Sequence, residues 1–365
     1  MKRNQPVRIE AASRPAGGEA AGYTDRLSKA LSGGGPVPNP LVCFVVGTGR
    51  CNSRCLYCPA WDHPAGDIDA PMLCRALREF AQMGGRVVGI SGGEPTLCGG
   101  MAEIIRTCAE TGLYSIIVTN GAFDAVDRLE ELLDAGLNAI EVSVDTLDPV
   151  KYKRIRGIEM DGVMKTLAAL EKWRNEGRVW GLLTSTLSAA NAPDILPLLD
   201  YARARSWQMT WHPLKLVRGI EDRIMELWPS EDVIREIENN LSLVIESDPD
   251  DVLLYADKTL LRHAGDALRS RRLRLSPCMA GWTEVDIALS GDVRACCSMP
   301  PVGNLRKAGL REIWNSRRMG LARAMTKRGL CPGCWYSGQI TEAMFWQRRM
   351  GLDVEDCIRG LPKRG

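Results

Sequence analysis

The chain has 365 residues, enough to bury a large core and to hold one large domain with a smaller second one. Its 47 basic and 45 acidic residues nearly cancel, which argues against nucleic acid or an anionic membrane as the main partner. No apolar run approaches the ~20 residues that cross a bilayer, and the N-terminus lacks the apolar stretch of a signal peptide. The 13 cysteines therefore indicate bound metal in a reducing cytoplasm rather than disulfides.

The first 38 residues are rich in Gly, Pro and Ser, with the runs AGGEAAG and SGGGPVPNP. Such composition is typical of chain that does not pack, so residues 1–38 are expected to form a mobile tail. An apolar run, Leu41–Val46, follows at once and predicts the first strand of a folded core.

Short apolar runs and amphipathic segments then alternate along the chain. The apolar runs predict strands near residues 41–46, 86–90, 115–119, 139–145, 179–187 and 208–216. The amphipathic segments predict helices near residues 70–83, 101–111, 125–135, 161–175 and 192–205. This alternation favours repeated βαβ units and a parallel sheet. Six units are too few for a closed eight-fold barrel, so the expected fold is α/β, an open partial (β/α)6 TIM-like barrel.

The loop after the first predicted strand carries Cys51, Cys55 and Cys58 in a C-x3-C-x2-C spacing. Three thiolates on a four-iron cube leave one iron with an open position, where a second molecule can bind and receive an electron. The alternative is zinc, which suits cysteine pairs two residues apart. Zinc needs a fourth ligand, and His63 is the nearest candidate. The spacing favours the iron–sulfur cluster.

The second predicted strand ends in the turn Gly92-Gly93-Glu94. Adjacent glycines let the backbone turn sharply and approach a ligand, and a glutamate beside them can accept a charged hydrogen bond from an ammonium group. Together with the cysteine loop one strand earlier, this turn resembles the radical S-adenosylmethionine (SAM) superfamily. The resemblance implies a [4Fe–4S] cluster on the three cysteines, with SAM bound to the fourth iron through its amino and carboxylate groups.

The same resemblance implies the residues that hold SAM. Gly92, Gly93 and Glu94 would orient its methionine part, and Tyr57 would lie against the adenine. The fourth predicted strand ends in polar residues, Ser143 and Asp145, that match the family's ribose contact. The alternative for this last pair is an ordinary turn at the end of a strand.

These motifs all end or follow predicted strands, as does the pair Thr119-Asn120. Ligands of parallel sheets bind beyond the carboxyl ends of the strands. We therefore expect the motifs to converge at one mouth of the barrel.

A second group of cysteines follows much later in the chain. Cys278 and Cys296 frame a predicted hairpin with the turn signal SGD, and Cys331 and Cys334 form a C-x2-C pair farther on. Four thiolates from two arms predict a closed site, either a fully ligated iron–sulfur cube or zinc.

The pattern from Cys278 to Cys334 resembles the auxiliary domain of SPASM/twitch radical SAM enzymes. Because only Cys357 follows, the resemblance is to the short twitch form with one auxiliary [4Fe–4S] cluster. The expected division of the chain is a mobile tail (1–38), a radical SAM core (39–217), a helical linker region (218–275), the auxiliary cluster domain (276–340) and a C-terminal tail (341–365).

Cys297 directly follows Cys296, and neighbouring side chains on a strand point to opposite faces. Its spacing from the hairpin glycine favours Cys296 as the ligand. Cys297 then either packs in the interior or donates a hydrogen atom to a substrate radical, as some radical SAM epimerases require.

The activity follows from the resemblance. It implies that a flavodoxin or ferredoxin reduces the first cluster, which splits SAM into methionine and a 5′-deoxyadenosyl radical that abstracts a substrate hydrogen. A fully ligated auxiliary cluster would accept the electron left on the substrate, so we expect a radical SAM oxidoreductase that dehydrogenates a small-molecule alcohol in a biosynthetic pathway. The alternatives are a peptide (RiPP) maturase or radical epimerase and, in a different class, a non-catalytic metal scaffold.

Overall fold

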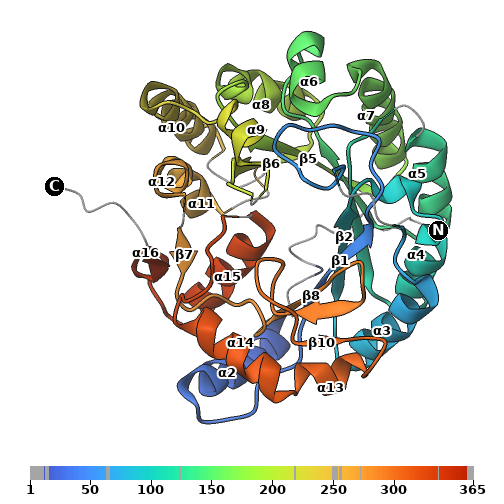
Figure 1. Ribbon diagram of the computed structural model, residues 1–365, viewed down its shortest axis with the longest axis vertical. Coiled ribbons are helices and arrows are strands. Elements are labelled where there is room, and N and C mark those ends of the chain that lie inside the picture. The colour runs from blue at the N-terminus through green and yellow to red at the C-terminus, as the bar shows by residue number, and fades with distance from the viewer. Residues whose placement is uncertain are drawn as a thin grey trace.

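The computed structural model describes residues 12, 16–62, 66–122, 125–217, 219–248, 254, 257–271, 273–335 and 337–359. Six parallel strands follow one another across a curved sheet (Figure 1). They are β1 (Val42–Thr48), β2 (Val87–Gly92), β3 (Tyr114–Thr119), β4 (Ala139–Ser143), β5 (Trp180–Leu187) and β6 (Gln208–Pro213). Each strand from β2 to β6 forms a parallel pair with the strand before it, as a series of βαβ units requires.

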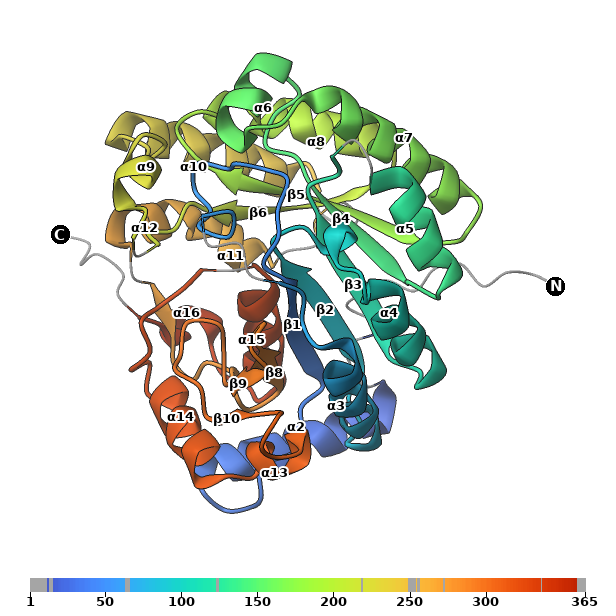
Figure 2. The same ribbon diagram turned by 45° about the vertical axis from the view of Figure 1, so that its right-hand side comes forward.

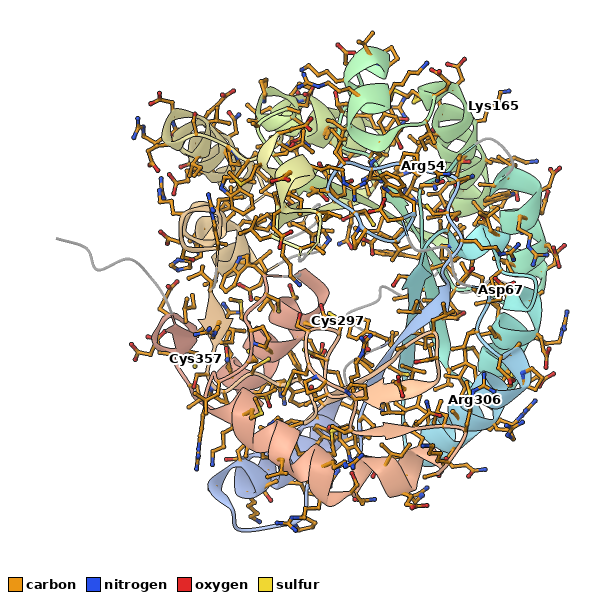
Figure 3. All side chains as sticks on the ribbon, in the orientation of Figure 1. Arg54, Asp67, Lys165, Cys297, Arg306 and Cys357 are labelled. Atoms are coloured by element: carbon orange, nitrogen blue, oxygen red, sulfur yellow. The ribbon has the colours of Figure 1, made fainter. Side chains whose placement is uncertain are left out.

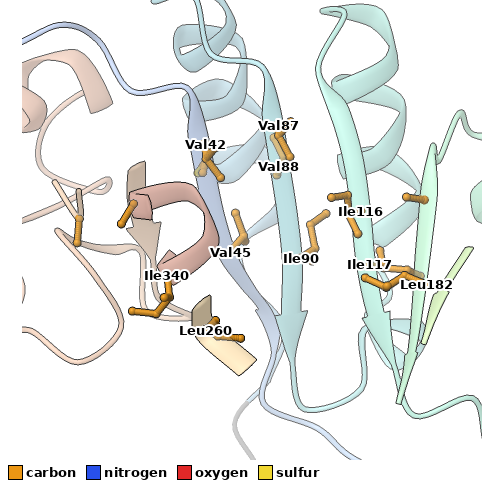
Figure 4. Close-up of a cluster of buried hydrophobic side chains, with 14 of the residues drawn as sticks. Val42, Val45, Val87, Val88, Ile90, Ile116, Ile117, Leu182, Leu260 and Ile340 are labelled. Carbon is orange, nitrogen blue, oxygen red and sulfur yellow. The ribbon is translucent and has the colours of Figure 1, made fainter. Parts of the chain in front are cut away.

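The helices between these strands cover the convex face of the sheet (Figures 1 and 2). They are α3 (Ala70–Gln82), α4 (Met101–Glu110), α5 (Ala125–Asp134), α6 (Pro149–Arg156), α7 (Met160–Asn175) and α8 (Ile195–Ala204). Alternate strand residues face these helices, and Ile90, Ile117 and Leu183 among them are wholly buried. Figure 4 shows apolar side chains of β1, β2, β3 and β5 together with Leu260 and Ile340, which come from helices later in the chain.

The barrel is open because β1 pairs on its second edge with β8 (Glu284–Ile287) and not with β6. The predicted hairpin forms β8 and β9 (Asp292–Arg294), and β10 (Gly303–Asn304) pairs beyond them. The full order is β10-β9-β8-β1-β2-β3-β4-β5-β6. The open α/β barrel expected from the sequence is thus confirmed, and the auxiliary domain extends the same sheet.

The region after β6 is helical, as its sequence suggested. It contains α9 (Glu221–Met225), α10 (Glu231–Glu246), α11 (Lys258–Arg262) and α12 (Ala264–Ser270), followed by β7 (Arg274–Leu275). Buried residues of α10, such as Ile237 and Leu241, join the main core. Among the helices that the structure describes, none is both long and apolar enough to span a bilayer.

The predicted mobile tail, residues 1–38, is wrong for residues 16–38, and its other residues, apart from residue 12, lie outside the described part of the chain. Residues Gly17–Ser32 form α2, which buries one face including Tyr23 and Leu27. The Tyr23 ring lies 4.8 Å from the ring of Trp346, centroid to centroid. The apolar residues recur at helical spacing, and this burial outweighs the cost of the glycines; Gly33 ends the helix with a positive φ of 87°.

The described part of the expected C-terminal tail, residues 341–359, is also folded. After α13 (Leu310–Trp314) and α14 (Arg317–Lys327), the chain forms α15 (Ser337–Arg349), α16 (Val354–Cys357) and β11 (Ile358–Arg359). β11 pairs with β7, and Trp346 of α15 is fully buried. Helices α2 and α15 therefore pack against each other beside the auxiliary domain, and Figures 1 and 2 both place α2 next to α13 and α14.

Leu27→Ala tests whether α2 belongs to the core. Leu27 has no exposed surface, so the substitution should lower the free energy of unfolding by about 2–5 kcal/mol, measured as a shift of the urea midpoint. Leu321→Ala is the matched control, because Leu321 is 60% exposed and its loss should change stability by less than about 0.5 kcal/mol. Equal midpoints for both variants would show that α2 contributes nothing.

Candidate active site

The cysteine loop, residues 49–62, is held by the end of α6. The backbone N–H of Arg54 donates to the carbonyl of Arg156 at 2.9 Å, and the Ser53 hydroxyl donates to the same carbonyl at 2.6 Å. A second backbone bond joins the N–H of Leu56 to the carbonyl of Ile155 at 3.0 Å. The loop is therefore fixed by its backbone, and its cysteine side chains remain available.

The three thiols of the loop lie near one another and are free of disulfides. Burial raises the pKa of Cys51 and that of Cys58, the latter to about 11, and the nearby Cys55 thiol adds to both shifts. Within the described residues, no three His, Cys, Asp or Glu side chains close around a point that one metal ion could occupy. Thiols on a four-iron cube each bind a different iron, so three neighbouring free thiols fit a cluster of that kind. His63, the fourth ligand considered for zinc, lies outside the described residues.

Polar groups surround the sulfur atoms of this loop. The Ser53 hydroxyl oxygen lies 3.2 Å from Cys55 Sγ, and Asn120 Nδ2 lies 4.0 Å from Cys51 Sγ. Asn120 also donates to the side chain of Asn52 at 2.7 Å. Such groups orient cluster ligands and tune their electronics. The sequence placed Asn120 at the mouth by its position after β3 but gave no sign of its contact with Cys51.

The glycine turn after β2 lies directly on the backbone of the cysteine loop. The Gly93 N–H donates to the Thr48 carbonyl and the Glu94 N–H to the Arg50 carbonyl, both at 2.7 Å. A Cβ on Gly93 would stand 2.0 Å from the Arg50 oxygen, and one on Gly92 would stand 2.3 Å from the Thr48 oxygen. Both glycines are needed for this close approach. The sequence analysis expected these glycines to let the backbone approach a ligand; the close approach that the structure shows is to the cysteine loop.

Glu94 is buried rather than open at the mouth, with only 1% of its surface exposed. Its Oε1 accepts from the Thr96 hydroxyl at 2.8 Å and from the Thr119 hydroxyl at 2.7 Å. Its Oε2 accepts from the backbone N–H of Asn120 at 2.7 Å. Burial raises the pKa of Glu94, and these hydrogen bonds oppose that shift. An ionised carboxylate oxygen can accept two bonds, so Oε2 can still receive one from a ligand.

Asp145 is wholly buried and forms the centre of a polar network. Its Oδ2 accepts from Arg156 Nε and from the Tyr57 hydroxyl, each at 2.8 Å. Its Oδ1 accepts from the backbone N–H of Thr186 at 2.8 Å. The ion pair with Arg156 joins β4 to α6, and the Arg156 guanidinium also lies 5.8 Å from the centre of the Tyr57 ring. In this geometry the Asp145 carboxylate orients the Tyr57 ring. Ser143, the other polar residue predicted at the end of this strand, is only partly buried.

The concave face of β4 to β6 is polar, which the sequence analysis missed. Ile140 and Val142 are buried toward the helices, so the alternating residues Glu141 and Ser143 face the other way. Burial raises the pKa of Glu141 to about 7. On β6, Thr210 pairs in register with Thr184 and has a buried hydroxyl with no partner among the described residues. Alternation of period two along β4 was the signal that could have revealed this wall.

The structure also brings the second group of cysteines together. Burial raises the pKa of the Cys278 thiol, and nearby acidic groups including Cys334 and Cys331 add to the shift. The pKa of Cys296 is raised by its hydrogen bond with Cys297 and by burial, and the nearby Cys334 thiol adds to the shift. Cys278 is anchored by its backbone N–H, which donates to the Thr326 carbonyl at 3.2 Å. Thiols from both arms of the domain thus approach one site, as expected.

Cys297 is exposed and Cys296 is half-buried. The two do not lie on opposite faces of a strand as predicted, because β9 ends at Arg294 and their thiols are hydrogen-bonded to each other in the turn that follows. Figure 3 places Cys297 on the concave side of the sheet. A hydrogen bond with Cys296 lowers the pKa of Cys297 to about 6, and the Lys215 ammonium favours the thiolate further. Lys215 itself donates to the Ser298 hydroxyl at 3.3 Å.

Comparison with known proteins matches two families in this order along the chain. Residues 45–186 match the Radical SAM superfamily, and residues 278–335 match SPASM, an iron–sulfur cluster-binding domain. The PqqA peptide cyclase of Methylobacterium nodulans is 32% identical over 174 residues, which cover 46% of this chain and 44% of that protein. The matched part is thus less than half the length of that relative.

Longer similarities agree with this result. The PqqA peptide cyclase of Xanthomonas axonopodis pv. citri is 26% identical over 76% of this chain and 75% of its own length. Streptococcus suis SuiB, solved with its precursor peptide SuiA, superposes with a TM-score of 0.63 at 18% identity, over 84% of this chain and 71% of SuiB. That likeness shows a shared fold.

The matched regions contain both groups of cysteines. Such domains bind SAM, a SAM-binding [4Fe–4S] cluster and auxiliary iron–sulfur clusters. This chain therefore belongs to the radical SAM superfamily and carries a C-terminal SPASM-type iron–sulfur domain.

Proposed function

We propose that this radical SAM enzyme modifies a peptide. The observation that carries the proposal is that a similarity over three quarters of the chain, 76%, is to a protein named as a peptide cyclase. The shared fold with SuiB, a protein whose solved structure holds a precursor peptide, supports the same reading. This proposal replaces the dehydrogenation of a small-molecule alcohol as the main interpretation, because the matched relatives are named for a peptide substrate.

The chain's own residues would hold the cofactors as follows. Cys51, Cys55 and Cys58 would bind the SAM-binding cluster, and the Gly92-Gly93 turn would carry the methionine part of SAM. The bound cofactors supply a radical able to remove hydrogen from an unactivated carbon. The protein must hold that radical beside its target and keep water away.

Four further residues would orient SAM. Glu94 would receive the SAM ammonium on Oε2, the carboxylate oxygen that accepts a single protein bond. Tyr57, fixed by Asp145, would lie against the adenine, and Ser143 would contact the ribose. Each carboxylate oxygen of Asp145 already accepts two hydrogen bonds from the protein, so we assign Asp145 to positioning Tyr57 rather than to direct contact with the ribose.

Cys278, Cys296, Cys331 and Cys334 would hold the auxiliary cluster, which would accept an electron from the substrate. In an epimerisation, Cys297, which is exposed on the concave side, would instead donate a hydrogen atom. A flavodoxin or ferredoxin would supply the electrons for SAM cleavage.

Replacing all three cysteines of the cysteine loop by Ala should remove about four irons per chain and abolish SAM cleavage. Iron analysis and chromatography of the cleavage products after anaerobic reconstitution measure both effects. Cys74→Ala is the control, because Cys74 is a buried cysteine on α3, outside the loop, and its loss should leave the iron content unchanged. Cleavage of SAM by the triple variant would refute the ligand assignment.

Replacing Cys331 and Cys334 by Ser should remove the auxiliary cluster while about four irons and SAM cleavage remain. Product formation should stop, because the electron acceptor is gone. Since metal sites can hold a domain together, circular dichroism must first show that the variant is folded. A folded variant that still forms product would show that the auxiliary cluster does not take part.

The proposed substrate class is tested by incubating the reconstituted enzyme with SAM, reductant and short peptides encoded beside its gene. A peptide cyclase or crosslinking enzyme should yield a peptide lighter by two hydrogens, and an epimerase a peptide of unchanged mass that gains deuterium from D2O. Mass spectrometry measures both. Consumption of an aminocyclitol alcohol, with every peptide left unchanged, would restore the small-molecule interpretation.

A further inference from the structure

A cavity of about 620 Å³ lies where three parts of the chain meet. One wall is formed by residues 213–216, the end of β6 and the segment that follows it. A second wall is formed by Trp228 and the end of α12. The third wall belongs to the auxiliary domain and includes Ser298 and residues 332–335. The sequence indicated no function for the helical region after β6. In the structure, this region lines part of the cavity.

The cavity is positively charged. Lys215 and Arg271 line it, and none of the described lining residues is Asp or Glu. The Arg271 guanidinium lies 4.7 Å from the centre of the Trp228 ring, a stacked arrangement that leaves its edge N–H groups available. No carboxylate of the described residues forms an ion pair with Arg271. A carboxylate ligand would provide a negatively charged partner for Arg271.

Buried apolar side chains form much of the remaining lining. Leu214, Leu273 and Trp335 line the cavity and expose at most 6% of their surface. The Trp335 indole N–H donates to the Leu260 carbonyl at 3.2 Å, which ties the auxiliary domain to α11. Apolar walls around two cationic side chains suit a ligand whose acidic group is flanked by apolar groups.

The cavity lies next to the proposed auxiliary cluster site. Cys334, an auxiliary ligand in our assignment, lines it, and Ser298 follows Cys297 in the chain. Leu214 donates its backbone N–H to the Leu187 carbonyl at 3.1 Å, so this wall stands at the carboxyl ends of β5 and β6. The cysteine loop follows the carboxyl end of β1 on the same edge of the sheet. A peptide with one residue at the mouth of the barrel can place a neighbouring residue here.

We propose that this cavity binds an acidic side chain of the substrate peptide, flanked by apolar residues, and so selects peptides with that pattern. The inference rests on the proposed peptide substrate and names its chemistry. Arg271 supplies the fork of donors that matches a carboxylate, and Lys215 supplies the second charge.

The test uses the reconstituted full-length enzyme with SAM and two fluorescein-labelled amidated peptides, Gly-Leu-Glu-Leu-Gly and Gly-Leu-Gln-Leu-Gly. Fluorescence anisotropy should give a Kd about tenfold lower for the Glu peptide, because only this peptide offers a charged partner. Arg271→Gln should remove the difference, and Arg271→Lys should keep much of it. Lys215→Gln provides a second, independent loss of charge. Arg262→Gln is the matched control, since Arg262 is an exposed arginine of α11 outside the cavity.

Equal Kd values for the two peptides on the wild type, or a preference that survives both Arg271→Gln and Lys215→Gln, would overturn the inference. Displacement of the Glu peptide by free glutarate at equal concentration would show a site for a small carboxylate and would also overturn it. Turnover separates the two proposals: an enzyme that modifies peptides without this preference refutes the cavity's role alone. An enzyme that modifies no peptide refutes the proposed function.

Discussion

The arrangement of the active site depends on one contact between two backbones. The turn after β2 lies so close to the cysteine loop that no side chain fits between them, and two hydrogen bonds of 2.7 Å join them. The loop that presents the three thiols and the turn that would carry the methionine part of SAM are therefore a single rigid unit. In the proposed function, the position of SAM relative to the cluster would then depend on backbone geometry, which varies little, instead of on flexible side chains.

A buried ion pair provides the same rigidity on the opposite side of the loop. Arg156 is the last residue of α6. Its carbonyl accepts a hydrogen bond from the cysteine loop, and its guanidinium forms an ion pair with Asp145. Isolating two charges from water costs free energy that the pair recovers only with good geometry and further hydrogen bonds. Here the carboxylate also holds Tyr57 and the backbone of β5, so one interaction connects the cysteine loop, β4 and β5.

Much of this could be predicted from the sequence, and the failures have physical causes. The strands from β1 to β6 carried strong apolar runs, and the cysteine spacings identified both metal-binding regions. The burial of Glu94 could not be foreseen, because its partners Thr119 and Asn120 come from β3. Helix α2 was missed since Gly and Pro obscured its apolar stripe, whose partner Trp346 lies more than 300 residues away in the chain. Such partners are known only once the chain is folded.

The pairing of β1 with β8 also has a consequence for how the protein is made. Val42 pairs with Glu284, about 240 residues later, so a ribosome completes the whole barrel before the neighbour of β1 exists. During that interval one edge of a largely apolar strand has unpaired N–H and C=O groups, which can recruit other chains. Long-range parallel pairing is also slow to form. The auxiliary domain therefore covers the open edge of the barrel's first strand, and the nascent chain is most vulnerable to aggregation after the barrel strands have been made and before β8 follows them.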